Sequence, residues 1–194
     1  DHMDQAAIVE QIAWADAGVA VTLNGNGLAL KPVLLAGNEE QKKKCCDIII
    51  NGGFGSFALT EPNAGCDAGA GKTTAVREGD EYVLNGRKCF ITNASVADFF
   101  VVTAMTAKDQ GTKGISAFLV YKGTPGLSVG NHENKMGIRC STTSDVLLED
   151  VRIPALFHLM QKTGSISEHD MFNTFNMGVG MVLTVPAEQA DKAL

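Results

Sequence analysis

The chain has 194 residues, of which 45% are hydrophobic and 20% charged, and its formal net charge is −6. This length suits one large domain or two small ones, and the acidic balance argues against a nucleic-acid surface, which would need clustered lysines and arginines. No apolar run reaches the roughly 18 residues that a membrane-spanning helix needs, so we expect neither nucleic acid nor a membrane as a partner.

The chain begins with a helical pattern. Residues 4–36 carry apolar side chains at helical spacing, interrupted at Asp16-Ala17-Gly18. Pro32 suits the first turn of a further short helix, and Gly37 suits the C-terminal end of that helix. We therefore predict a series of helices, separated by short breaks, up to Gly37.

A capping box marks the start of the next helix. Asn38 has the side chain of an N-cap, and Gln41 stands three residues later as its partner. The helix is predicted to run from Glu39 to Ile50 and to end at Asn51-Gly52-Gly53, because asparagine and glycine favour turns.

Short strand-like segments dominate residues 53–154. Turn signals separate them, and Asn85-Gly86 between two apolar runs is a strong hairpin signal. The predicted strands are Gly55–Thr60, Lys72–Arg77, Glu81–Leu84, Lys88–Ile91, Phe99–Met105, Ile115–Tyr121, Leu127–Gly130 and Ser144–Val151. Strands at this spacing are typical of an antiparallel barrel or sandwich, here of about seven to eight strands.

Residues 155–194 change texture again. Ser167 suits the N-cap of a helix from Glu168 to about Phe175. Val179–Val185 is an apolar run that favours a strand, and Pro186 suits the start of another helix. This pattern predicts a tail of helix, strand and helix.

The predicted fold class is α+β, in three domains. A partial helical domain occupies residues 1–52, an antiparallel β-barrel or sandwich occupies residues 53–154, and the α/β tail occupies residues 155–194. Because the edge of the Val179–Val185 strand needs a cover, we expect a second chain to supply it, which predicts a homo-oligomer.

Cysteine and histidine usage limits the chemistry further. The five cysteines are an odd number without a CxxC pair, and the four histidines have no ligand-like spacing. This pattern fits neither a disulfide framework nor a zinc site. We expect reduced thiols, a cytoplasmic location and no bound metal.

Several stretches of the β-rich part together resemble a known family. They are residues 57–67, 90–93, 135–143 and 148–154. Alone, Glu61–Gly65 would be a turn and Phe90–Thr92 an ordinary strand. In this order and at this spacing the stretches resemble the flavin-dependent acyl-CoA dehydrogenases, and the resemblance covers about residues 4–155.

The resemblance implies an activity, a cofactor and partners. Members of this family remove two hydrogens from the α and β carbons of an acyl-CoA thioester in fatty acid metabolism, and FAD accepts the hydride. Their usual electron acceptor is an electron-transferring flavoprotein. The resemblance therefore implies FAD as cofactor, acyl-CoA as substrate and that flavoprotein as partner.

The resemblance also implies which residues bind the flavin. They are Phe57, Leu59, Thr60, Gly65, Cys66, Phe90, Ile91 and Thr92. Thr60 would donate to the polar edge of the ring, Phe90 would stack near it, and Thr92 would donate near N5. Gly65 would allow close approach of the cofactor. Cys66 stands where the family often has serine or threonine, and a thiol is a weaker donor.

Residues 153–194 resemble a different family. The stretches Leu159–Gly164 and Ser167–Val182 are similar to the C-terminal domain of aminoimidazole ribonucleotide synthetase, a cyclo-ligase of purine synthesis. This resemblance predicts a chimera joined near Ile153-Pro154-Ala155. The proton-abstracting glutamate of the dehydrogenases lies in a C-terminal helical domain that this sequence does not resemble, so we expect no catalytic residue in the chain.

These observations leave three interpretations. The main one is an acyl-CoA dehydrogenase by descent that is truncated and inactive as an isolated chain. A non-catalytic chimeric module for folding or association is the second, and a fragment of the purine cyclo-ligase is the third. Binding of FAD separates the first interpretation from the other two.

Overall fold

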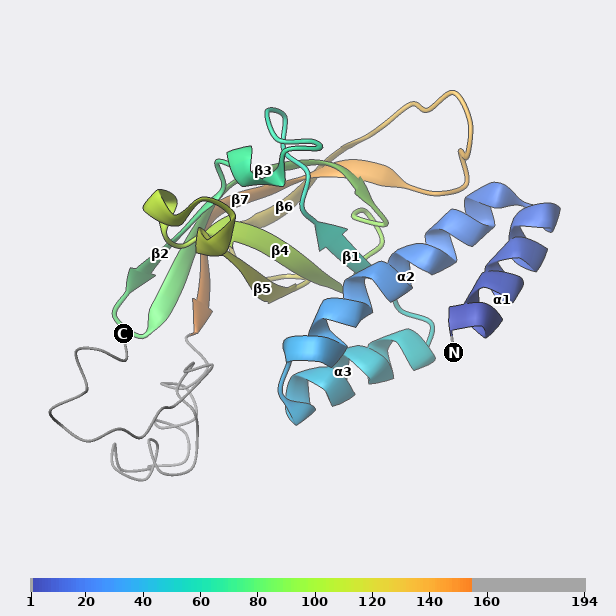
Figure 1. Ribbon diagram of the computed structural model, residues 1–194, viewed down its shortest axis with the longest axis horizontal. Helices are drawn as coiled ribbons and strands as arrows, with labels where there is room; N and C mark the ends of the chain where they lie inside the picture. The colour runs from blue at the N-terminus through green and yellow to red at the C-terminus, as the bar shows by residue number, and fades with distance from the viewer. Residues whose placement is uncertain (1, 155–194) are drawn as a thin grey trace, which may run out of the picture. The chain divides into compact units, whose positions relative to one another are not determined.

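The computed structural model describes residues 2–154 (Figure 1). Within that range the helices are α1 (His2–Ala15), α2 (Ala17–Ala36) and α3 (Glu39–Ile50). The strands and two short 3₁₀ segments are β1 (Gly55–Ala58), η1 (Ala68–Ala70), β2 (Thr74–Glu78), β3 (Glu81–Thr92), β4 (Phe99–Met105), η2 (Lys108–Gly114), β5 (Ile115–Tyr121), β6 (Leu127–His132) and β7 (Thr143–Pro154). The predicted α+β fold is confirmed, whereas the predicted tail lies outside the described residues.

Side-chain caps begin the second and third helices; the cap of α3 is as predicted, whereas at Asp16 the sequence indicated only a break. The Asp16 carboxylate accepts a hydrogen bond from the backbone N–H of Val19 at 2.9 Å, where α2 begins. Asn38 and Gln41 form a reciprocal capping box, with bonds of 2.8 and 3.0 Å. Each such cap contributes about 0.5–2 kcal/mol, so the local sequence fixes where these helices start.

Pro32 lies inside α2 instead of opening a new helix, so that prediction is wrong. A proline inside a helix removes one backbone hydrogen bond and strains the preceding turn. The neighbouring side chains offset this cost, since Ala29 and Val33 are buried against the rest of the chain. Packing therefore carries the helix through a position where the sequence favours a new start.

α2 also corrects the expectation about apolar runs. Its 20 residues are long and apolar enough, by length and composition, to cross a membrane. A mostly buried core helix passes the same test, whereas 22% of this stretch is buried here; α2 packs on α1, α3 and β1. Ala20, Ala29 and Val33 are buried in these contacts.

The strands form one curled, mixed sheet in the order β1-β4-β2-β3-β7-β6, with β5 also paired to β4 (Figure 1). The β2–β3, β4–β5 and β6–β7 pairs are antiparallel. The β1–β4 and β2–β4 pairs are parallel, which an all-antiparallel prediction misses. The seven strands agree with the predicted number.

The predicted hairpin at Asn85-Gly86 is wrong, because β3 runs through both residues without a break. The turn between β2 and β3 lies at Gly79-Asp80 instead. The Asn85 side chain donates to the Asp150 carboxylate at 2.9 Å. A Cβ on Gly86 would lie 2.4 Å from Thr73 Oγ1, so this glycine permits a close approach and does not make a turn.

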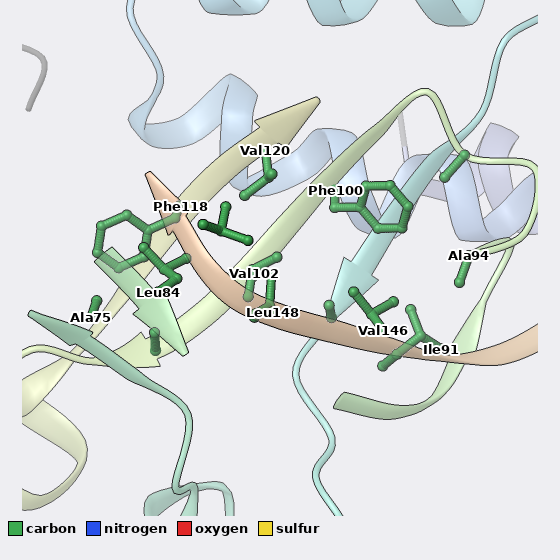
Figure 2. Packing of buried hydrophobic residues seen from close by; sticks show 14 residues of the cluster. Ala75, Leu84, Ile91, Ala94, Phe100, Val102, Phe118, Val120, Val146 and Leu148 are labelled. Atoms are coloured by element: carbon green, nitrogen blue, oxygen red, sulfur yellow. The ribbon is translucent and has the colours of Figure 1, made fainter. Parts of the chain in front are cut away.

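Strand β4 is buried on both faces and divides the apolar interior in two. Phe100 and Val102 belong to the larger cluster, which lies inside the curled sheet (Figure 2). Phe99 and Val101 point the other way and pack with Val33 and other residues of the helical part. This alternation is the period of two that a strand imposes, and it fastens the helices to the outside of the sheet.

Candidate functional site

A cleft of about 310 Å³ opens between α2, the end of β1 and the end of β3. It is lined by Gly25, Leu28, Phe57, Leu59, Thr60, Phe90, Ile91 and Thr92. Sites for small molecules have volumes of roughly 300–1,000 Å³. The structure thus brings together all of the predicted flavin-binding residues except Gly65 and Cys66.

Gly65 and Cys66 lie in the loop between β1 and η1. A Cβ added to Gly65 would meet nothing within 4 Å. Cys66 is exposed and its thiol is free. Neither residue lines the cleft, so their contact with a cofactor stays a prediction.

Two lining residues on α2, Gly25 and Leu28, are absent from the predicted set. A Cβ on Gly25 would lie 2.7 Å from Asn93 Nδ2, so glycine lets the helix approach the end of β3 closely. The stretch Asn24–Gly27 is the signal that could have found it. Each glycine inside a helix costs roughly 0.5–1 kcal/mol relative to alanine, which points to a constraint from packing.

Phe90 has an unusual backbone and an exposed ring. Its φ is 57°, and its side chain is 64% exposed although it belongs to β3. A left-handed conformation costs a non-glycine residue roughly 1–2 kcal/mol, and such strain gathers at functional sites. The strained residue here is one that lines the cleft, which agrees with a functional role.

Hydrogen bonds hold α2 at the cleft. The Asn26 carboxamide oxygen accepts from the backbone N–H of Gly55 at 3.0 Å. Asn93 is fully buried and donates from Nδ2 to the carbonyl of Thr22 at 2.8 Å. Since these bonds join the helix to both ends of the lining, the helical part and the sheet build the cleft together.

The lining suits a flat ring with one polar edge. Its side chains are apolar apart from the hydroxyls of Thr60 and Thr92, and none of these lining residues carries a carboxylate or an amine. An aromatic ring gains contact with Phe57 and Phe90, and each hydroxyl can donate one hydrogen bond. The residues therefore fit an isoalloxazine ring, although they supply no group that takes up a proton.

A buried ion pair contacts the cleft wall, because the Lys88 ammonium donates to the carbonyl of the lining residue Leu59. The Lys88 ammonium is 2.7 Å from the Glu61 carboxylate, and the two side chains are 2% and 6% exposed. Burial alone would raise the pKa of Glu61, but hydrogen bonds from Lys88 and from neighbouring residues outweigh it and lower the pKa. Burial also lowers the pKa of Lys88, against the opposite effect of Glu61.

The lowered pKa of Glu61 predicts a loss of stability in acid. Its stabilising effect is fully present above the ordinary carboxyl pKa of 4.5 and is lost as the pH falls through the lower folded-state value, because the unfolded chain takes up the proton first. We expect Glu61→Gln to flatten this part of the pH profile in urea unfolding at pH 7, 5 and 3. Glu39→Gln is the control, since the Glu39 side chain is 91% exposed. An unchanged slope in Glu61→Gln would contradict the assignment.

Known families match most of the chain. The acyl-CoA dehydrogenase N-terminal domain matches residues 1–53, and the acyl-CoA dehydrogenase middle domain matches residues 56–151. The chain belongs to the acyl-CoA dehydrogenase family. The family resemblance read from the sequence is confirmed for these two domains.

Individual proteins of the acyl-CoA dehydrogenase family are also similar to this chain. A short-chain-specific acyl-CoA dehydrogenase of Megasphaera elsdenii is 44% identical over 158 residues, which are 80% of this chain and 41% of that protein. The CarC subunit of the caffeyl-CoA reductase–Etf complex of Acetobacterium woodii is 47% identical over 156 residues, or 79% of this chain and 41% of that protein. The solved butyryl-CoA dehydrogenase of Megasphaera elsdenii has 46% identity and a TM-score of 0.73, covering 76% of this chain and 39% of that one.

The chain spans about two fifths of the length of these relatives. The acyl-CoA dehydrogenase homologues are FAD-dependent flavoproteins, which agrees with the predicted cofactor. The cleft described above is lined by helix α2 of the first domain and by strands of the second. Both matched domains therefore contribute to the place where we expect the cofactor.

Proposed function

We propose that this chain forms the flavin cleft of an FAD-dependent acyl-CoA dehydrogenase. The observation that carries the proposal is the apolar cleft, in which Phe90, Thr60 and Thr92 share one lining. Phe90 would support the face of the ring, and the two threonine hydroxyls would donate to its polar edge. FAD, when bound, supplies the acceptor for the hydride.

The substrate and the electron acceptor are part of the same proposal. An acyl-CoA thioester is supported by the name of the Megasphaera elsdenii relative, a short-chain-specific acyl-CoA dehydrogenase. An electron-transferring flavoprotein is supported by CarC, which is named as a subunit of a complex with Etf. We propose both for the whole enzyme of which this cleft would be a part.

A general base is missing from the described part of the cleft. Its lining holds no carboxylate, and a base contributes roughly 10²–10⁴-fold to rate. We therefore propose that the base comes from outside residues 2–154. Because the sequence after this range resembles a different family, we also propose that the isolated chain does not turn over acyl-CoA. Measured reduction of an artificial electron acceptor by the isolated chain would contradict this.

Three further expectations remain proposals. Self-association is supported by exposed apolar side chains of the helical part, with Trp14 89% and Leu35 77% exposed. A cytoplasmic location rests on the free thiols of the described cysteines. Descent of about residues 153–194 from the purine cyclo-ligase, and hence a chimera, rests on the sequence alone, since residues 155–194 lie outside the described residues.

The proposal predicts that FAD binds and that Phe90 matters for it. In a titration of FAD fluorescence, the unaltered chain is expected to show saturable binding. Phe90→Ala is expected to weaken it about two- to thirteenfold, because one stacked aromatic contact is worth roughly 0.5–1.5 kcal/mol. Val76→Ala is the matched control, since Val76 is 56% exposed and does not line the cleft. An unaltered chain that binds no FAD would refute the function.

A further inference from the structure

Lys88 has all of its hydrogen-bonding capacity used inside the protein. Its ammonium donates to Glu61 Oε1 at 2.7 Å, to the carbonyl of Leu59 at 3.1 Å and to Thr103 Oγ1 at 3.2 Å. An ammonium has three donors, so each one has a partner. One point charge thus holds β3, the segment after β1, and β4 at a single place.

Glu61 collects a second set of bonds at the same place. Its carboxylate accepts from the backbone N–H of Lys72 at 2.5 Å and from that of Thr73 at 3.1 Å. These residues lead from η1 into β2. The ion pair therefore joins four segments that lie far apart in the sequence.

The atoms fixed by the pair are next to the cleft walls. Leu59 lines the cleft itself, and Thr60 stands between Leu59 and Glu61. The carbonyl of Thr60 accepts from the backbone N–H of Cys89 at 2.8 Å. That bond lies between Lys88 and Phe90, so the buried pair and the two walls form one continuous unit.

The side-chain directions in β3 show why this place needs fixing. Residues two apart in a regular strand share a face, yet Lys88 is buried and Phe90 is 64% exposed. The positive φ of Phe90 interrupts the regular alternation. An exposed ring on a strained backbone keeps its position only if the residues before it are held in place.

A buried ion pair is a weak source of stability. Replacing such a pair by apolar groups is often neutral or stabilising, whereas removing one partner costs roughly 3–5 kcal/mol. We therefore expect this pair to fix the positions of atoms and to add little to the free energy of unfolding. Its many bonds to backbone atoms are of the kind that fix positions.

We propose that Lys88 and Glu61 are positioning residues, whose buried pair sets the place of Thr60 and Phe90 and thereby the affinity of the cleft for flavin. The part about flavin rests on the proposed function. The part about position concerns the chain alone. The two parts are tested by separate measurements on the same variants.

The test uses Lys88→Met alone and together with Glu61→Gln. The single variant leaves a buried carboxylate unpaired and loses stability. The double variant removes that charge and keeps an oxygen for the N–H groups of Lys72 and Thr73. We expect the double variant to recover most of the stability in urea unfolding. Arg87→Gln is the control, because Arg87 precedes Lys88, is itself exposed and forms its ion pair with Asp145 instead of Glu61.

Two measurements report on the position of the cleft walls and not on the free energy of unfolding. We expect the Cys89 amide, which bonds to Thr60, to exchange its hydrogen at least tenfold faster in the double variant than in the unaltered chain. We also expect FAD to bind at least tenfold more weakly, with a shifted absorption band of the bound flavin. Arg87→Gln should change both by less than twofold.

The outcomes separate the two parts. If the double variant regains both the slow Cys89 exchange and the flavin affinity along with its stability, the pair is merely structural and the proposal is overturned. If the unaltered chain binds no FAD, the proposed function fails, and so does the flavin part of this inference. The Cys89 exchange then still decides whether the pair positions the walls.

Discussion

Replacing Phe100 by alanine is expected to lower the free energy of unfolding by about 3–5 kcal/mol, the usual cost of deleting a buried aromatic ring. Phe100 is 1% exposed, and its ring lies in the same cluster as Val102 and Val120 (Figure 2). Because β4 pairs with three other strands, its neighbours have little freedom to collapse into the space left by the ring.

Urea unfolding followed by the circular dichroism of the backbone measures this loss. Phe90→Ala is the matched control, because it deletes the same ring at a position that is 64% exposed. We expect that variant to lose about 1 kcal/mol or less, since an exposed ring gives up little burial. Equal losses at the two positions would show that the sheet interior is not packed as described.

Gly126→Ala is expected to cost about 3 kcal/mol or more. Gly126 has a φ of 83°, and an added Cβ would lie 2.0 Å from the backbone oxygen of Glu149. The alanine would therefore meet both a disfavoured conformation and a collision with main chain that cannot rotate away. The collision would separate the start of β6 from the middle of β7, where Leu127 pairs with Leu148.

Gly123→Ala separates the two contributions to this cost. Gly123 lies in the same connection and has a φ of 85°, but an added Cβ would meet nothing within 4 Å. We expect it to lose only the conformational part, roughly 1–2 kcal/mol. Thermal unfolding of both variants checks the difference, and a Gly126→Ala midpoint no lower than that of Gly123→Ala would refute the described contact.

Local sequence is enough to predict most elements of this fold. The predicted bounds of β4 and β5 agree with the structure to the residue, because each is a continuous apolar run between turn signals. The Asn38 capping box likewise lies within four residues of chain. Pairing is harder to predict, because the parallel β1–β4 contact joins segments whose partners are decided by the whole sheet.

In the site, too, some residues can be predicted from local sequence and others only from the folded sheet. Motifs of the family predict the cleft residues in and just after β1 and those in β3, whereas Gly25 and Leu28 lie on a helix with no such motif. Lys88 and Glu61 were missed as a buried pair because charged residues are almost never fully buried unless paired. Their partners become visible only after the strands are placed side by side.

The parallel pairing of β1 has a consequence for synthesis. Its partner in β4 lies 44 positions later in the chain, so at about 5–20 residues per second β1 emerges from a ribosome roughly 2–9 seconds before β4. Helix α2 is already made by then, and its Asn26 side chain bonds to Gly55 at the start of β1. The native partner that β1 can meet first is therefore helix α2, and its partner strand β4 follows seconds later.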